Sequence, residues 1–436
     1  PAQINVPRDY WTQVIDIDLP PIVRFERQGG GQDAIEKAAK LLSDAKFPVI
    51  LSGAGVVIGD AIEDCKKLAE KLDAPVCNGY QHNDSFPGSH PLAVGPLGYN
   101  GSKAAMELIS KADVVLALGT RLNPFSTLPG YGIDYWPKSA TIIQVDMNPD
   151  RIGLTKKVTV GICGDAKMVS QQLLDKLSSN AGDNGRDERK NLIHQTKSAW
   201  LQTLTGLDHE DDDPGTVWNK EARERDSDRM SPRQAWRAIQ VGMPDDVIIS
   251  SDIGNNCAIG NAYPTFEKGR KYLAPGLFGP CGYGFPSILG AKIGCPDTPV
   301  IGFAGDGAFG ISMNEMSSCA RKEWPAITMV IFRNYQWGAE KRNSILWFDD
   351  NFVGTELDPE LSYAKVANAC GLKGVTVKTM EETTAAIKQS CEDQKKGITT
   401  FIEVILNQEL GEPFRRDAMK KPVRVAGIKK EDMKPQ

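Results

Sequence analysis

The sequence predicts an α/β protein with two doubly wound domains, each built on a parallel sheet. Amphipathic segments such as Asp33–Ser43 and Asp60–Leu72 carry apolar residues at helical spacing. They alternate with segments such as Pro48–Ser52 and Asp113–Leu118, which are largely apolar and suit strands buried on both faces. A polar, charged stretch from Leu173 to Arg229 separates this series from a second one.

Composition narrows the functional class. The 436 residues, 41% of them hydrophobic, are enough for two or three domains with ordinary cores. A formal net charge of −5 gives no general attraction to nucleic acid or anionic lipid, so a small-molecule site is the better expectation. No apolar run reaches the roughly 20 residues that span a bilayer, and no signal peptide is evident, so we expect a cytoplasmic protein. The nine cysteines show no paired metal spacing and are expected to be reduced core residues.

The first α/β unit is expected at residues 32–175. Its glycine run from Gly53 to Gly59 has the spacing Gly-x-Gly-x-x-x-Gly, which differs from that of a dinucleotide loop. It favours a turn that packs a helix on a strand. His82 and His90 lie in a Pro- and Gly-rich loop, and the sequence leaves open whether they serve structure or an active site.

Residues 176–230 are expected to form one or two exposed helices and a loop between the domains. The acidic run 210–213 suits a solvated face better than a metal site. His194 and His209 have no partner cluster in the sequence, so we expect both at the surface.

The second α/β unit is expected at residues 231–410. Ser231 is placed to cap a helix that begins with proline, and a strand is expected over Asp246–Ser251. Two polar or glycine-rich turns, Asp252–Asn256 and Gly279–Pro286, are expected to converge with two later turns on one sheet edge.

The later turns carry the strongest signal for chemistry. An apolar strand stops at a Gly-Asp-Gly triplet around Asp306, a helix is expected over Ser312–Lys322, and a second apolar strand over Ile327–Phe332 leads to Asn334. Strand–helix–strand units are right-handed and parallel, so Asp306 and Asn334 should share the edge where ligands bind. Their oxygens suit a Mg²⁺ that holds a diphosphate, and glycines let backbone N–H groups approach that anion. The triplet alone fits a plain turn equally well.

The spacing of these residues resembles the thiamine diphosphate (ThDP) motif of ThDP-dependent enzymes. The usual Asn-Asn pair of that motif is Arg333-Asn334 here, so one Asn is replaced. The run NYQWGAEKRN, which starts at Asn334, is similar to that of the sulfoacetaldehyde acetyltransferase family, an acetolactate synthase-like group. GTRLNP and QVDMNPDRIG resemble the central domain of the same group. The resemblance implies a central Rossmann-like domain and a C-terminal domain that binds the ThDP diphosphate.

The resemblance also implies a site for ThDP and Mg²⁺. Asp306, the Asn334 side chain and the Gln336 backbone carbonyl would bind the metal. Trp337 and Gly338 would donate backbone N–H groups to the diphosphate. Cys281 occupies the place of an apolar wedge beneath the cofactor, although a packing thiol is the simpler interpretation. The other implied cofactor-binding residues are Gly254, Asn255, Asn256, Gly282, Gly305, Gly307 and Ala308.

The activity implied by the resemblance converts sulfoacetaldehyde and phosphate to acetyl phosphate and sulfite, in taurine and sulfonate degradation. Both substrates are anions, and Arg333, Lys341, Arg342 and Arg121 are candidates to bind them. One alternative is an acetolactate synthase or 2-oxo acid decarboxylase with the same cofactor. Another is a non-catalytic nucleotide-binding or assembly subunit. Some relatives bind FAD or ADP in the central domain, and we expect no flavin here.

The family architecture implies a homodimer or homotetramer, without nucleic-acid or membrane partners. Residues 1–31 are similar to the end of an N-terminal pyrimidine-binding domain followed by a linker. The missing part of that domain would supply the glutamate that activates the cofactor, so the chain alone is expected to be inactive. Residues 411–436 form a basic tail that could close over an anionic substrate or remain solvated.

Overall fold

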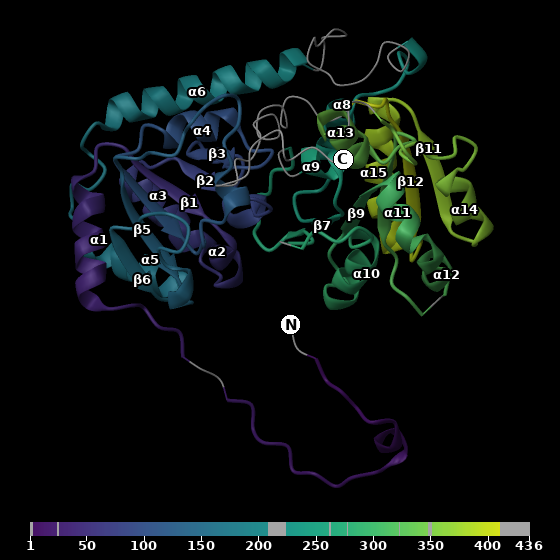
Figure 1. The fold of residues 1–436 in the computed structure, drawn as a ribbon, viewed down its shortest axis with the longest axis horizontal. Helices are drawn as coiled ribbons and strands as arrows, with labels where there is room; N and C mark the ends of the chain where they lie inside the picture. Colours follow the sequence, from purple (N-terminus) through teal and green to yellow (C-terminus); the bar gives the residue numbers. More distant parts are fainter. Residues whose placement is uncertain are drawn as a thin grey trace.

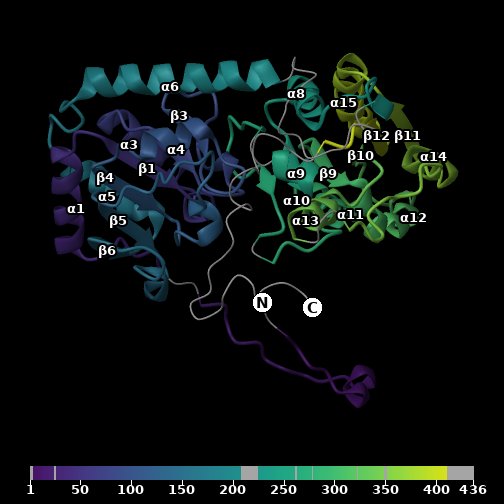
Figure 2. The ribbon, with the colours of Figure 1, turned by 45° about the horizontal axis from the view of Figure 1, so that its top comes forward.

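The structure is a computed structural model of the 436-residue chain. The residues that it describes are 3–23, 26–207, 224–260, 263–276, 278–321, 323–347 and 351–409, without the side chains of 207, 256–258, 342, 343 and 345–347. Two α/β domains lie side by side, and the long helix α6 (Arg186–Leu207) runs from the first toward the second (Figure 1, Figure 2). Residues 3–23 are exposed and extend away from both domains. Across the described ranges, no helix has the length and apolar character needed to cross a bilayer.

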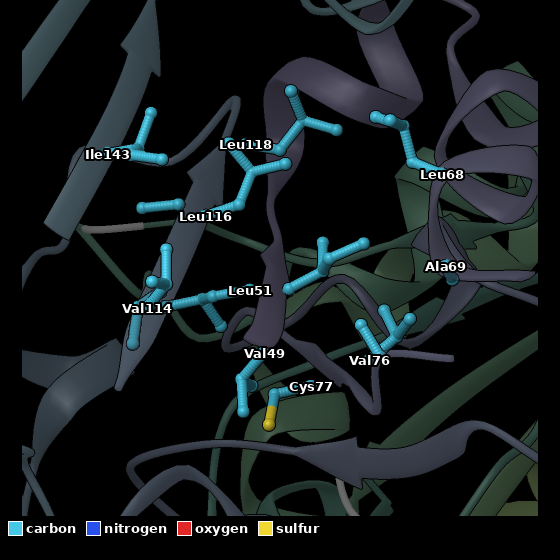
Figure 3. Close-up of a cluster of buried hydrophobic side chains, with 14 of the residues drawn as sticks. Val49, Leu51, Leu68, Ala69, Val76, Cys77, Val114, Leu116, Leu118 and Ile143 are labelled. Atoms are coloured by element: carbon cyan, nitrogen blue, oxygen red, sulfur yellow. The ribbon is translucent and has the colours of Figure 1, made fainter. Parts of the chain in front are cut away.

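The first domain is built on a six-stranded parallel sheet in the order β3-β2-β1-β4-β5-β6. Its strands are β1 (Pro48–Ser52), β2 (Val76–Asn78), β3 (Ala93–Pro96), β4 (Val114–Leu118), β5 (Thr141–Asp146) and β6 (Val160–Cys163). Its helices are α1 (Gln32–Asp44), α2 (Ala54–Ile58), α3 (Ile62–Leu72), α4 (Lys103–Ile109) and α5 (Ala166–Lys176). Every residue of β1 and β4 is buried, which explains their continuous apolar sequence. Figure 3 shows Val49 and Leu116 of these strands gathered with Leu68 of α3 in one cluster.

The second domain has a six-stranded parallel sheet in the order β11-β12-β10-β9-β7-β8. Its strands are β7 (Ile248–Ser251), β8 (Tyr272–Leu273), β9 (Val300–Gly305), β10 (Thr328–Arg333), β11 (Lys373–Val377) and β12 (Thr400–Ile405). Its helices are α8 (Pro232–Gly242), α9 (Asn255–Gly260), α10 (Gly284–Gly294), α11 (Asp306–Ser312), α12 (Met316–Cys319), α13 (Gly338–Trp347), α14 (Tyr363–Ala369) and α15 (Met380–Lys395).

Successive residues of the central strands point to opposite faces of this second sheet. Phe303 of β9 joins a hydrophobic cluster with Trp236 of α8 and Ile387 of α15. Its neighbour Ala304 joins a separate cluster with Phe285 of α10. The period of two along a strand therefore places both clusters, one on each face, and gives the domain three layers.

The two domains meet at the edge strand β8. Asp84 is buried and accepts hydrogen bonds at Oδ2 from the N–H groups of Lys271 (2.9 Å) and Tyr272 (3.2 Å). The Arg270 guanidinium donates to the Val57 carbonyl of the first domain (2.9 Å). These contacts fix β8 against the first domain, and the loop that follows β8 lines the site described below.

The predicted fold class, two doubly wound parallel-sheet domains, is confirmed. One predicted element is wrong at its start. The helix expected over Ser312–Lys322 begins at Asp306, directly after β9, and a 3-10 turn at Met313–Glu315 separates α11 from α12. Two glycines lie inside α11, where each is unfavourable by about 1 kcal/mol, so tertiary packing overrides the local preference. The acidic run 210–213, His209, Lys322 and the tail 411–436 lie outside the described residues.

Candidate functional site

A pocket of about 210 Å³ lies at the carboxyl ends of the second sheet's strands. Because these strands are parallel, the four segments that follow β7, β8, β9 and β10 reach the same edge. These are the four turns that the sequence predicted would converge. The lining residues are Ile253, Gly254, Asn255, Gly279, Cys281, Gly305, Asp306, Gly307, Ala308, Asn334, Gln336, Trp337, Gly338, Ala339 and Glu340.

Glycine backbone is exposed to this pocket at several points. A Cβ atom at Gly254 or at Gly305 would meet no protein atom within 4 Å. Gly254 also has a φ of +118°, a conformation that L side chains rarely adopt. The chain therefore leaves open space beside its backbone where a side chain would otherwise stand. Such an arrangement suits a ligand that approaches backbone N–H groups closely.

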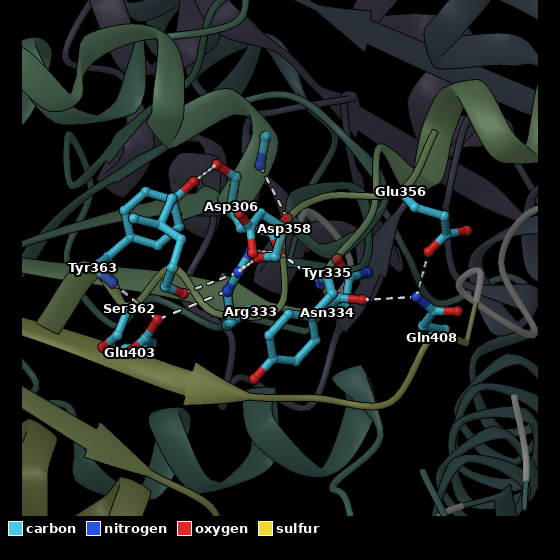
Figure 4. Close-up of polar contacts among 12 residues, drawn as sticks. Asp306, Arg333, Asn334, Tyr335, Glu356, Asp358, Ser362, Tyr363, Glu403 and Gln408 are labelled. Carbon is cyan, nitrogen blue, oxygen red and sulfur yellow. Dashed lines mark hydrogen bonds and ion pairs between the residues drawn. The ribbon is translucent and has the colours of Figure 1, made fainter. Parts of the chain in front are cut away.

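Asp306 is the buried carboxylate of the pocket and is only 1% exposed. Its Oδ2 accepts hydrogen bonds from the Tyr335 N–H (2.7 Å) and from Arg333 Nη1 (3.1 Å). Its Oδ1 accepts one from the Gly307 N–H (2.9 Å). Burial raises the pKa of Asp306 to about 6, although Arg333 and the Tyr335 N–H act in the opposite direction. Figure 4 shows the carboxylate beside Arg333 and Tyr335.

Arg333 does not lie where a substrate anion could reach it, which corrects its assignment as an anion-binding candidate. Its side chain is 1% exposed and is paired with Asp306 and, at 3.8 Å, with Glu403. It also donates to the backbone carbonyls of Asp358 and Leu361. The physical reason is that β10 is buried on both faces, so the last residue of the strand points into the protein.

Asn334 and Gln336 are buried next to the pocket and are held by one glutamine. Gln408 Nε2 donates to the Asn334 carbonyl (3.2 Å) and to Glu356 Oε2 (3.0 Å). Gln336 Nε2 in turn donates to the Gln408 carbonyl (3.1 Å). The short segment between β10 and α13 is therefore tied to the end of β12. Lys341 forms an ion pair with Glu356 and does not line the pocket.

Trp337 differs from its expected role as a backbone donor. Its N–H already donates to the Thr355 carbonyl (2.8 Å), so in this structure that hydrogen is not directed at a ligand. The indole instead packs on Gly307, where a Cβ atom would come 2.8 Å from two ring carbons. Trp337 thus contributes to the pocket by packing, and Gly307 is required by that close approach.

Asp252 organises the opposite wall of the pocket. Its carboxylate accepts hydrogen bonds from the N–H groups of Ile253 (2.8 Å), Gly282 (3.1 Å) and Gly284 (2.7 Å). Gly282 therefore faces Asp252, beside the pocket lining. Cys281, its neighbour, is exposed and lines the pocket. Burial, followed by the charges of Asp252 and Glu340, raises the pKa of the Cys281 thiol.

The remaining residues singled out in the sequence either have undescribed side chains or do not line the pocket. The side chains of Asn256 and Arg342 lie outside the description. Arg121 belongs to the first domain and does not line the pocket. His82 lies near Arg121. Burial, followed by the Arg121 charge, lowers the pKa of His82 to about 4. His90 contacts Glu70 (3.2 Å), also away from the pocket.

The donor set fits a hard divalent cation with a diphosphate. Asp306 would offer one carboxylate, and Asn334 and Gln336 would offer amide and carbonyl oxygens. Mg²⁺ commonly takes one or two protein carboxylates and completes its coordination with phosphate oxygens and waters. Within the described ranges, no group of three or more His, Cys, Asp or Glu side chains could hold a metal ion. A site completed by phosphate oxygens is compatible with the residues that line this pocket.

The roles of three residues of the site were not identified from the sequence, although Asp252 lies in a turn that was predicted to converge there. Asp252 and Gln408 hold the two walls, and Glu403 holds Arg333. Glu403 did leave a signal, since it is an isolated acid within the apolar strand β12 and is 2% exposed. A buried carboxylate requires partners. Its partners, Ser362 Oγ (2.7 Å) and the Tyr363 N–H (3.1 Å), come from another segment, which the local sequence does not reveal.

Comparisons with known proteins agree with this geometry. Residues 35–173 match the family described as "Thiamine pyrophosphate enzyme, central domain", and residues 252–404 match "Thiamine pyrophosphate enzyme, C-terminal TPP binding domain". The "Probable sulfoacetaldehyde acetyltransferase" of Rhizobium meliloti (strain 1021) is 78% identical over all of this chain and 74% of its own length. The "Sulfoacetaldehyde acetyltransferase" of Roseovarius nubinhibens is 72% identical over all of this chain and 72% of its own length. The "Probable acetolactate synthase large subunit" of Methanococcus aeolicus is 28% identical over 89% of this chain and 65% of its own length.

Proposed function

The chain belongs to the sulfoacetaldehyde acetyltransferases, a group of thiamine pyrophosphate enzymes, and from this premise we propose that it transfers the acetyl group derived from sulfoacetaldehyde to phosphate. The products are acetyl phosphate and sulfite. Relatives with 78% and 72% identity over the whole chain support this substrate. An acetolactate synthase or decarboxylase activity is the weaker alternative, because the acetolactate synthase relative shares only 28% identity.

The observation that carries the proposal is the meeting of Asp306 and Asn334 in one pocket with open glycine backbone. We assign Asp306, the Asn334 side chain and the Gln336 carbonyl to Mg²⁺. The backbone at Gly254, Asn255, Gly305 and Ala308 is assigned to the ThDP diphosphate. Bound ThDP supplies the carbon nucleophile for the aldehyde; the protein's part is to bind, orient and exclude water.

Six further residues complete the assignment. We assign Gly338 and Asn256 to the diphosphate, while Gly307 and Trp337 shape the wall by packing on each other. Cys281 lies at the pocket surface, where it would contact the cofactor. Gly282 holds this turn through Asp252.

The two anionic substrates require cationic donors near this pocket. Lys341 remains a candidate among the described residues, because its ion pair with Glu356 lies on the segment that follows the pocket. Glu356 is about half exposed, so the pair is screened and its replacement by a substrate anion costs little. Arg342 remains a candidate by its position next to Lys341. Arg121 would need to reach the site from the first domain.

The wider organisation is part of the same proposal. The central domain spans residues 32–175, a linker spans 176–230, and the ThDP-binding domain spans 231–410. We propose a cytoplasmic homodimer or homotetramer, as the family architecture implies, that acts on small molecules without nucleic-acid or membrane partners.

The test uses the purified protein, in its full-length form if the gene extends upstream, and supplies ThDP, Mg²⁺, sulfoacetaldehyde and phosphate, with pyruvate as the parallel substrate. Sulfite release and acetyl phosphate are followed together. We expect sulfite release that depends on phosphate and is matched by acetyl phosphate. Turnover of pyruvate in place of sulfoacetaldehyde would move the function to the synthase or decarboxylase alternative.

A further inference from the structure

We propose that Arg333 is a positioning residue that holds the Asp306 carboxylate in the orientation needed for Mg²⁺. This inference rests on the proposed ThDP and Mg²⁺ site and goes beyond it, because Arg333 stands where the ThDP motif usually has an Asn. Arg333 is among the largest fully buried side chains in the described part of the chain. A buried guanidinium at a metal-binding carboxylate requires an explanation in physical terms.

The two carboxylate oxygens of Asp306 accept different numbers of hydrogen bonds from the protein. Oδ2 receives two donors, Arg333 Nη1 at 3.1 Å and the Tyr335 N–H at 2.7 Å. Oδ1 receives one, the Gly307 N–H at 2.9 Å. A carboxylate oxygen has two lone-pair sites, so Oδ2 is saturated by the protein. Oδ1 keeps a site for a cation, and rotation that would exchange the two oxygens breaks the bonds to Oδ2.

Arg333 can act in this way because its own position is fixed from several directions. Its Nη2 donates to the Leu361 carbonyl at 3.0 Å and to the Asp358 carbonyl. The guanidinium also lies 4.2 Å from the centre of the Tyr335 ring. A planar group with five donors in a fixed fork can satisfy these acceptors together, which a lysine ammonium cannot. The segment before α14 therefore holds Arg333, and Arg333 holds Asp306.

The charge of Arg333 is balanced, so it need not oppose a nearby cation. Glu403 lies 3.8 Å from Arg333 Nε and is itself 2% exposed. Ser362 Oγ and the Tyr363 N–H donate hydrogen bonds to the Glu403 carboxylate and hold it beside Arg333. One guanidinium thus faces two buried carboxylates, which leaves a net negative charge for Mg²⁺ at Asp306.

The test measures metal affinity without turnover. Mn²⁺, which can be counted by its electron paramagnetic resonance signal, is titrated into protein with saturating ThDP, for wild type, Arg333→Met and Arg333→Lys. Loss of a group that orients a metal ligand lowers affinity by roughly 10- to 100-fold, which we expect for Arg333→Met. Arg333→Lys should restore part of this loss, because the charge returns without the fork. If Arg333→Met does not fold, the Mn²⁺ affinity of Arg333→Lys is compared with that of the wild type, and a lower affinity in Arg333→Lys is the expected result.

A matched control is Arg229→Met, because Arg229 also stacks on the Tyr335 ring at 4.9 Å but pairs with Asp226. Its Mn²⁺ affinity should equal that of the wild type. The melting temperature of each variant without metal reports folding separately. The inference is overturned if Arg333→Met binds Mn²⁺ as tightly as the wild type or more tightly, and Asp306→Asn loses Mn²⁺ binding. If Asp306→Asn binds as the wild type does, the proposed function fails and this inference fails with it.

Discussion

The Trp337 indole packs directly on the backbone of Gly307, so that a Cβ atom at Gly307 would lie 2.8 Å from ring carbons Cδ2 and Cε3. Real Cβ contacts are not this short, and the indole forms one wall of the pocket. Addition of a single methyl group must therefore displace either Trp337 or the first turn of α11, which carries Asp306.

Gly307→Ala should destabilise the second domain and weaken cofactor binding. Overpacking in a close-packed region costs typically about 1 to 3 kcal/mol, and the displaced turn carries Asp306, which we propose to bind Mg²⁺. The measurement is the urea unfolding midpoint together with ThDP affinity at fixed Mg²⁺. A gain in stability, as expected of alanine in an open helix, would contradict the packing described here.

Gly310→Ala is the matched control within the same helix. A Cβ atom at Gly310 would meet only the Tyr363 hydroxyl, at 3.4 Å, which is an ordinary contact. Alanine is favoured over glycine in a helix by about 1 kcal/mol. The same substitution three residues further along α11 should therefore be neutral or stabilising and should leave ThDP affinity unchanged.

His82 should make the protein less stable as the pH falls from neutral. Burial and then the Arg121 charge lower its pKa to about 4, below the ordinary value of 6.5. Between these values the unfolded chain binds a proton that the folded chain does not, so protonation stabilises the unfolded state relative to the folded state. The wild type should lose about 1 to 2 kcal/mol more than His82→Gln between pH 7 and 5. His194→Gln, on the exposed side of α6, should retain the wild-type slope.

Cys281 should be protected by the cofactor. It is exposed and lines the pocket, whereas Cys163 and Cys295 are exposed elsewhere and serve as internal controls. Alkylation by iodoacetamide, followed for each cysteine by mass spectrometry, should slow at Cys281 when ThDP and Mg²⁺ are added. The rates at the two control cysteines should stay the same. Unchanged alkylation of Cys281 would place the cofactor away from this wall.

The sequence allowed the meeting of Asp306 and Asn334 to be predicted, because it depends on local information. Each follows a continuous apolar strand, and parallel pairing of β9 with β10 brings the two strand ends together. The capping box at Ser231 was equally local, with Gln234 three residues away.

The role of Arg333 could not be predicted, because its partners are distant in the sequence. An arginine after an apolar strand suits a substrate anion as well as an ion pair, and Glu403 lies seventy residues further along the chain. The same applies to the Trp337 N–H, whose acceptor Thr355 belongs to a segment without a recognisable motif. Tertiary contacts determine the partners of Arg333 and of the Trp337 N–H, and no local sequence pattern reveals such contacts.

Calorimetric titration of ThDP into the protein, with and without Mg²⁺, tests whether this pocket is the cofactor site. Wild type should bind ThDP in a Mg²⁺-dependent way, and Asp306→Asn should lose roughly 100-fold or more in affinity because the carboxylate proposed to bind Mg²⁺ is removed. Asp246→Asn, at an ion pair with Lys268 and Lys271 away from the pocket, should bind as the wild type does. Equal ThDP affinity in wild type and Asp306→Asn would contradict the proposed site.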